Sequence, residues 1–157
     1  MMAKIGVDAC FLIGLYDEAD SHHSTSIRHF DALFGEKAAR NQLIVPWPIL
    51  YECCGTRQVR NPRKTALLRQ HWSYLQRNGR LILLDDRAFR EQPIEEHLTE
   101  RSRQLSLVDR VLRAMIVDLK RPFDVFLTYN TGDFADACLS GGVYLLNENI
   151  SAESYGI

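Results

Sequence analysis

Short apolar runs alternate with longer amphipathic segments along the whole chain. Five predominantly apolar runs have the length of strands, at residues 4–8, 42–45, 81–84, 124–128 and 143–146. Segments between them carry apolar residues at helical spacing. Strands that are apolar on both faces and separated by helices are typical of a parallel sheet with helices on both sides. We therefore expect one three-layer α/β/α domain over residues 1–157, with a central, mainly parallel sheet of about five strands.

Boundary residues place the helices between these strands. Asn61 followed by Pro62 predicts a helix start, because asparagine caps helices and proline is tolerated in the first turn. Asn78 followed by Gly79 predicts the end of that helix, since glycine readily adopts a positive φ. Further helices are expected at residues 9–16 and 22–34, from Pro46 onward, at 93–104, and from a Ser106 cap to Lys120.

The charge balance argues against one common class of nucleic-acid-binding protein. The chain has 19 Lys and Arg against 20 Asp and Glu, which gives a net charge of −1. Proteins that coat phosphate backbones are usually far more basic, because counterion release drives their binding. A role with nucleic acid would therefore need a local cationic patch, or metal ions that reverse the local charge.

The cysteines and the lengths of the apolar runs indicate the cellular compartment. None of the four cysteines forms a C-x-x-C pair, and all lie in apolar surroundings. We interpret them as buried free thiols in a reducing compartment. No segment approaches 18 consecutive apolar residues, and the N-terminal segment does not resemble a signal peptide. We expect a cytoplasmic protein without a membrane span.

Four acidic residues fall near the expected carboxyl ends of the strands, where ligands bind in open parallel α/β sheets. They are Asp8, Glu52, Asp109 and Asp133. Two unit charges about 4 Å apart repel by roughly 4 kcal/mol at an effective dielectric constant of 20, so converging carboxylates favour a bound cation. Oxygen ligands favour Mg²⁺ or Mn²⁺, and two such ions can activate water for attack on a phosphodiester.

Each of these acids also has a purely structural interpretation. Asp8 could cap the helix that follows it, and Glu52 could interact with a helix dipole. Asp109 stands three residues after Ser106, which is the spacing of a capping box. Asp133 could be a turn residue. Their joint placement, rather than any single position, carries the prediction of a metal site.

Four sequence blocks, in order, resemble those of the PIN-domain ribonucleases, particularly the VapC-type toxins of bacterial toxin–antitoxin pairs. The blocks are IGVDACFLI around Asp8, VPWPILYE ending at Glu52, LSLVDRVL around Asp109, and LTYNTGDF around Asp133. The stretch DSHH at residues 20–23 also resembles a loop of that family. In the last block, Thr128 and Asn130 stand as polar neighbours of Asp133, and Asn130 replaces an acid that some relatives carry.

The resemblance implies a fold, an activity and partners. It implies a PIN-like domain that cleaves RNA with Mg²⁺ or Mn²⁺, through a metal-bound water that leaves a 5′-phosphate and a 3′-hydroxyl. It further implies an RNA substrate, a homodimer, and an antitoxin protein whose C-terminal segment enters the active-site groove.

Cationic and aromatic residues near these acids are candidates for RNA contacts. Arg110 and Arg113 flank Asp109 and are our candidates for phosphate binding. Tyr129 could stack on a base or be buried, and the pair His22 and His23 is expected at the surface. Further cations are Arg57, Arg60, Arg63, Lys64, Arg101 and Arg103, which could equally form a solvated, salt-bridged surface.

Other functional interpretations remain open on the sequence alone. A haloacid-dehalogenase-type phosphatase also begins with an Asp at a strand end, but it needs a second Asp two positions later, where this chain has Cys10. A non-catalytic RNA-binding PIN module would be expected to have lost at least one acid. A PIN nuclease that processes RNA without being a toxin is hardly distinguished from a toxin by these residues.

Overall fold

The computed structural model describes residues 2–36, 40–55, 61–99 and 104–156. Its centre is a five-stranded sheet in the order β3-β2-β1-β4-β5, in which every neighbouring pair is parallel. The strands are β1 (Lys4–Val7), β2 (Gln42–Pro46), β3 (Leu81–Leu84), β4 (Val125–Leu127) and β5 (Tyr144–Leu146). The expected parallel sheet and α/β fold class are confirmed.

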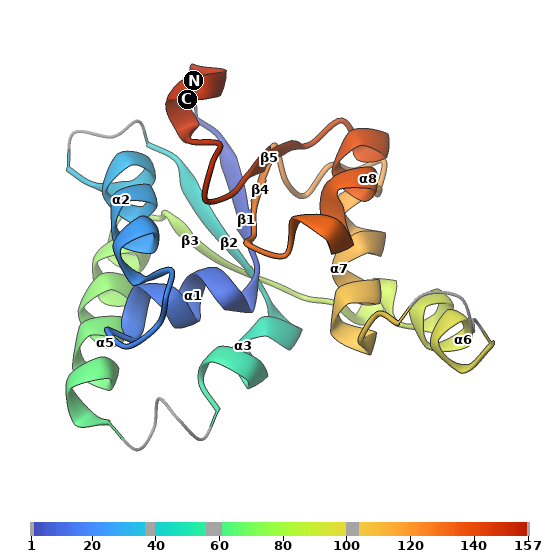
Figure 1. Cartoon of the computed structure of the whole chain (residues 1–157), viewed down its shortest axis with the longest axis horizontal. Helices are drawn as coiled ribbons and strands as arrows, with labels where there is room; N and C mark the ends of the chain where they lie inside the picture. Colours follow the sequence, from blue (N-terminus) through green and yellow to red (C-terminus); the bar gives the residue numbers. More distant parts are fainter. Residues whose placement is uncertain (1, 37–39, 56–60, 100–103, 157) are drawn as a thin grey trace.

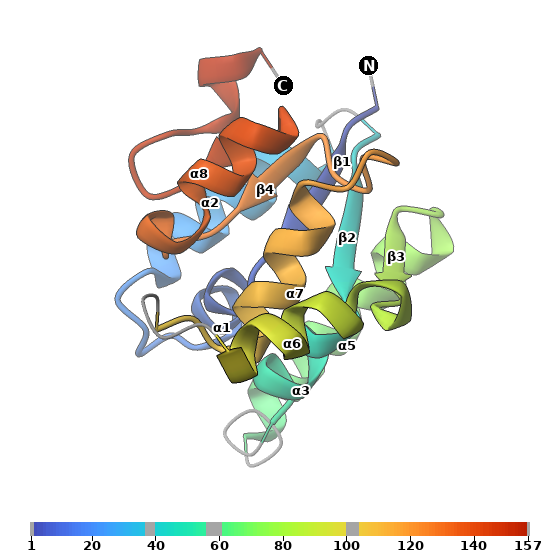
Figure 2. The same cartoon turned by 90° about the vertical axis from the view of Figure 1, so that its right-hand side faces the viewer.

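Helices cover both faces of this sheet, as Figure 1 shows. One face carries α1 (Ala9–Tyr16), α2 (His23–Phe34) and α5 (Pro62–Arg77), with α3 (Trp47–Cys53) packed on α1. The other face carries α7 (Leu107–Ile116) and α8 (Thr131–Gly141), with α6 (Glu91–Thr99) outside α7, which Figure 2 views from that side. Two short 3₁₀ helices, η1 (Arg87–Phe89) and η2 (Ala152–Tyr155), complete the described elements.

The hydrophobic core lies on both faces of the sheet around its central strand, β1. Ile5, Val7 and Phe126 are fully buried, and burial of each such side chain contributes roughly 1.5–3 kcal/mol. Gly6 is needed in β1 because a Cβ atom there would stand 2.4 Å from Cδ1 of Phe123. The close contact between backbone and ring fixes β1, and therefore the residue that follows it.

Several element ends differ from the sequence-based expectation. The helix capped by Ser106 ends at Ile116 instead of Lys120: Val117 is its C-cap, and the Asp118 N–H donates to the Met115 carbonyl, a tighter turn that ends the α-helical pattern. The helix expected at 93–104 spans Glu91–Thr99, and residues 100–103 lie outside the described part. The predicted Asn61 cap and the positive φ of Gly79 (64°) are confirmed.

Two further expectations bear on the compartment. The cysteines are free thiols: Cys53 and Cys138 are buried, while Cys10 and Cys54 are half-buried. Among the residues that the structure describes, no helix has the length and apolar character needed to cross a bilayer.

Candidate active site

The candidate site lies at the carboxyl ends of β1 and β4. The chain builds the sheet outward from β1 through β2 to β3, and then returns to place β4 on the other side of β1. Such a reversal opens a crevice between the two adjacent strands, and ligands bind there in open α/β sheets. Asp8 and Thr128 are the residues directly after these strands, and the Asp8 N–H donates to the Leu127 carbonyl at 3.0 Å.

Asp8 is held in place by several donors. Its side chain is buried, with only 4% of the residue exposed. Oδ1 accepts the Ala9 N–H at 2.6 Å, and Oδ2 accepts the Thr128 hydroxyl at 2.9 Å and the Cys10 thiol at 3.2 Å. Burial raises the pKa of Asp8 above its usual value, these hydrogen bonds lower it, and the charge of Asp109 raises it further. The site therefore contains a fixed carboxylate that is costly to ionise without a counterion.

Glu52 and Asp109 lie near Asp8 but are held differently. Although Glu52 is exposed on α3, neighbouring protein removes part of its hydration and raises its pKa, and the charges of Asp8 and Asp109 raise it further. Asp109 forms the predicted capping box with Ser106. Oδ2 of Asp109 accepts hydrogen bonds from the Ser106 N–H at 3.1 Å and from the Ser106 hydroxyl at 2.6 Å. The structure thus brings three of the predicted acids together, from β1, α3 and α7.

Asp133 and Asn130 lie on the α8 side of the crevice. Asp133 is in the first turn of α8, and its carbonyl accepts a hydrogen bond from the Arg113 guanidinium. It is not among the charges that shift the pKa of Asp8 or Glu52. The Asn130 N–H donates to the Thr128 hydroxyl oxygen at 3.0 Å, so Thr128 connects Asp8 with the start of α8.

The donor set suits a hard divalent cation. Within the described ranges, no three His, Cys, Asp or Glu side chains are close enough to surround a metal ion as they stand. However, Asp8, Glu52 and Asp109 offer only oxygen ligands, which Mg²⁺ and Mn²⁺ prefer. A cation near them would also relieve the repulsion that raises the pKa of Asp8 and Glu52.

The structure argues against Arg110 as a direct phosphate ligand. Its side chain is 3% exposed, and its Nη1 lies 3.9 Å from Oε2 of Glu96 on α6. Arg113 is also engaged, since its Nη1 and Nη2 donate to the Asp136 carboxylate at 2.6 and 2.8 Å. These two arginines join α7 to α6 and α8. Arg57, Arg60, Arg101 and Arg103 lie outside the described residues.

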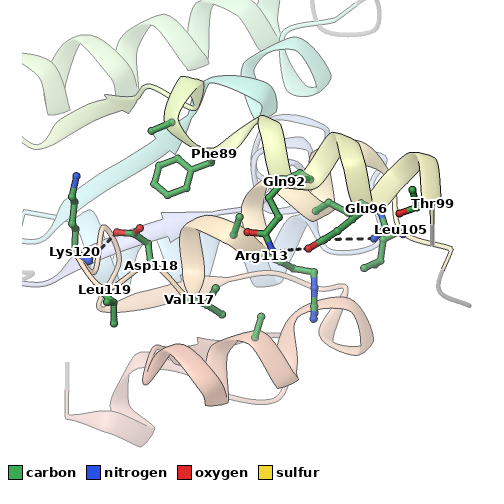
Figure 3. Close-up of a pocket in the computed structure, with 15 residues that line it drawn as sticks. Phe89, Gln92, Glu96, Thr99, Leu105, Arg113, Val117, Asp118, Leu119 and Lys120 are labelled. Carbon is green, nitrogen blue, oxygen red and sulfur yellow. Dashed lines mark hydrogen bonds and ion pairs between the residues drawn. The ribbon is translucent and has the colours of Figure 1, made fainter. Parts of the chain in front are cut away.

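A cavity of about 840 Å³ lies beside these arginines, between α6, α7, the turn after α7 and the second half of α8. Figure 3 shows Arg113, Glu96 and Gln92 at one end of it, with Asp118 and Lys120 at the other. None of the four predicted acids lines this cavity. We therefore place the candidate active site at the carboxyl ends of β1 and β4, where the carboxylates lie, rather than in this cavity.

Two residues near the carboxyl ends of β1 and β4 were not predicted as part of the site. Cys10 donates to Asp8, and burial raises the pKa of its thiol to about 12, so it is a neutral donor near neutral pH. His22 stacks on Tyr129, with ring centroids 4.2 Å apart and an interplanar angle of 14°. The sequence held a signal for each: Cys10 stands two residues after Asp8, and His22 lies in the DSHH stretch.

The sheet order and the helices on its two faces define a PIN-like α/β domain. In a comparison with solved structures, the chain is similar to the VapC20 toxin of Mycobacterium tuberculosis, which is described as cleaving the sarcin-ricin loop. The TM-score is 0.53, with 19% sequence identity over 84% of this chain and 94% of that chain. No protein-family model and no curated protein matches this sequence. At this identity the likeness establishes the fold alone.

Proposed function

We propose that this protein is a metal-dependent endoribonuclease that hydrolyses RNA phosphodiester bonds. The observation that carries the proposal is that Asp8, Glu52 and Asp109 come from three separate elements and lie close together: the charge of Asp109 raises the pKa of Asp8, and the charges of Asp8 and Asp109 raise the pKa of Glu52. They do so at the strand ends where this class of fold binds ligands. A cluster of carboxylates suits a divalent metal and the phosphate that it would bind.

Each residue has a distinct role in this proposal. Asp8, Glu52 and Asp109 hold Mg²⁺ or Mn²⁺, with Asp133 completing the set from α8. When bound, such an ion supplies a Lewis acid and lowers the pKa of its bound water toward neutrality. The Thr128 hydroxyl and the Cys10 thiol orient the buried carboxylate of Asp8 through their hydrogen bonds. Asn130 positions Thr128 through its backbone N–H.

We further propose that the nuclease is the toxin of a toxin–antitoxin pair in the cytoplasm. The likeness to a VapC toxin supports this role. Large apolar side chains are exposed on α3, α6 and the start of α7, namely Trp47 (41%), Tyr51 (75%), Ile94 (48%), Leu98 (78%) and Leu107 (37%). Exposed apolar surface of this kind marks protein interfaces. It supports contacts with a second copy or with an antitoxin.

The direct test is cleavage of end-labelled RNA by purified protein with Mg²⁺, Mn²⁺ or EDTA. The substrates include unstructured RNA and a stem-loop with the sarcin-ricin sequence. We expect metal-dependent cuts that Asp8→Asn reduces by about a thousandfold, because loss of a metal ligand removes several kcal/mol of stabilisation. The matched control is Asp31→Asn, which changes an exposed aspartate on α2 and should cleave like wild type.

Either of two results would contradict the nuclease. Equal cleavage by wild type and Asp8→Asn would show that the cuts do not come from this site. RNA binding without cleavage by folded protein in the presence of metal would indicate a non-catalytic RNA-binding module.

A further inference from the structure

A stacked pair of aromatic rings lies beside the candidate site, where β4 ends. Tyr129 directly follows Thr128 at the end of β4, and His22 precedes the first residue of α2. Their rings are nearly parallel, 4.2 Å apart at the centroids. Residues 107 positions apart in sequence thus form one flat surface at the end of the sheet.

Both rings are held from several directions. The Tyr129 hydroxyl and the Ser26 hydroxyl lie 2.8 Å apart in a hydrogen bond. The His22 backbone N–H donates to Oδ1 of Asp20 at 2.8 Å, and Nδ1 of the imidazole lies 3.6 Å from Oε2 of Glu148, which follows β5. A ring that is oriented before binding loses little conformational freedom when a ligand packs on it.

This pair is directly connected to the carboxylate cluster. The Tyr129 N–H donates to Sγ of Cys10 at 3.2 Å, and that thiol donates to Oδ2 of Asp8 at 3.2 Å. Two consecutive hydrogen bonds therefore link the Tyr129 backbone to the carboxylate of Asp8. A nucleotide next to a phosphate at Asp8 would lie within reach of these rings.

The exposure of His22 indicates which face is available to a ligand. Its side chain is 33% exposed, while Tyr129 covers one side of the imidazole. Because Tyr129 covers one face, a ligand has to approach the ring from the opposite face or the edge. Flat, oriented aromatic surfaces of this kind bind unpaired nucleobases by stacking.

We infer that the exposed face of His22 stacks on an unpaired base of the RNA, adjacent to the phosphate at the carboxylate cluster. His22 is then a substrate-positioning residue, and Tyr129 is the support beneath it. This inference rests on the proposed function, since it names how that site holds its RNA. It also specifies the substrate class: the strand must be single at this nucleotide, because a base in a duplex cannot reach the ring.

The test distinguishes stacking on the ring of His22 from hydrogen bonding by its imidazole nitrogens. His22→Phe keeps a flat ring and loses the imidazole nitrogens, whereas His22→Gln keeps a polar side chain and loses the ring. The control is His97→Gln, on an exposed face of α6. Steady-state cleavage of single-stranded RNA gives kcat and KM. Oligonucleotides with 2-aminopurine at successive positions report stacking through fluorescence quenching, which is followed by rapid mixing with Mg²⁺ before cleavage so that the carboxylate cluster stays intact.

We expect His22→Gln to raise KM about tenfold with little change in kcat, and to abolish quenching at one position of the oligonucleotide. His22→Phe and His97→Gln should stay within about twofold of wild type. Melting curves of each variant confirm the fold, because a merely structural histidine would lower the melting temperature without a position-specific loss of quenching.

Two outcomes overturn the inference while leaving the nuclease intact. If His22→Gln matches wild type in KM and quenching, no base stacks on this ring. If His22→Phe is as defective as His22→Gln, the imidazole nitrogens rather than the ring determine binding. If wild-type protein cleaves no RNA with any metal, the proposed function fails first, and the inference fails with it.

Discussion

The carboxylates of the candidate site are held in two different ways. Asp8 is buried at the end of β1, where Ala9, Cys10 and Thr128 donate to its two oxygens. Glu52 is an exposed side chain on α3. The sheet side of the site is therefore rigid, whereas Glu52 on the helix side can move and hydrate.

This difference assigns different electrostatic costs to the two acids. For both residues the first cause of the raised pKa is lost hydration, but Asp8 is almost fully enclosed and Glu52 is not. An exposed charge recovers hydration by small movements, whereas a buried charge needs a counterion or a proton. We therefore expect Asp8 to dominate metal binding and the pH dependence of stability, with Glu52 second.

Metal binding should give the largest contrast between the two acids. At a Mg²⁺ or Mn²⁺ concentration of about 100 times Kd, binding to the folded state contributes roughly 2.7 kcal/mol, or about 5–10 °C in melting temperature for a domain of this size. Asp8→Asn should abolish this increase because it removes the fixed ligand. Glu52→Gln should leave part of it, since a flexible ligand can be replaced by water.

Thermal melts with and without metal measure this contrast, with Glu95→Gln on the exposed surface of α6 as control. If Asp8→Asn and Glu52→Gln lose the metal-induced rise in melting temperature equally, the buried and the exposed acid do not differ in metal binding. No increase in wild type would mean that these acids do not bind the metal.

The pH dependence of stability without metal should show a smaller contrast. Because burial raises the pKa of Asp8 above its unfolded value, the folded state binds this proton more tightly than the unfolded chain does. Raising the pH through the interval between the two pKa values therefore lowers the free energy of unfolding. Asp8→Asn removes this loss, so its melting temperature at pH 7 should exceed that of wild type by a few degrees.

The difference should vanish below the usual aspartate pKa of about 3.9, where Asp8 is protonated in both states. Melting curves in EDTA from pH 3 to pH 8 follow it. Glu52→Gln should show the same sign with a smaller amplitude, and Asp31→Asn should show none. A variant Asp8→Asn that is less stable than wild type at pH 7 would mean that the hydrogen bonds of Asp8 outweigh the cost of its burial.

The local parts of the fold could be predicted from sequence. The apolar runs placed all five strands, and the Ser106 and Asn61 caps were correct because capping depends on residues only two or three positions away. The position of Asp8 followed from the same pattern, since an acid directly after a buried strand must lie at the sheet edge. That the four acids bind metal remains a prediction.

The parts that depend on tertiary packing could not be predicted. Arg110 is buried because α6 lies against α7 and brings Glu96 to it, and nothing in the sequence near Arg110 specifies that neighbour. The stack of His22 on Tyr129 likewise requires the start of α2 to meet the end of β4.

The smallest expected effect concerns Arg113, which joins the helix side of the site to α8. Its pair with Asp136 is partly exposed, with 21% and 56% of the side chains accessible, so the pair contributes about 1 kcal/mol or less to stability. Arg113→Met keeps the aliphatic contact but loses this pair and the bond to the Asp133 carbonyl, whereas Asp136→Asn loses the charge of the pair and keeps the bond to the Asp133 carbonyl. Urea unfolding should therefore rank Arg113→Met as the less stable variant.

Cleavage kinetics of the same two variants separate structure from substrate binding. If Arg113 also contacts an RNA phosphate, Arg113→Met should raise KM several-fold, while Asp136→Asn should leave KM unchanged or lower it because the guanidinium is released from its partner. A KM that rises equally in both variants would assign Arg113 to holding α8, and therefore Asp133, in place. In that case Arg113 would act by positioning Asp133 rather than by binding the substrate.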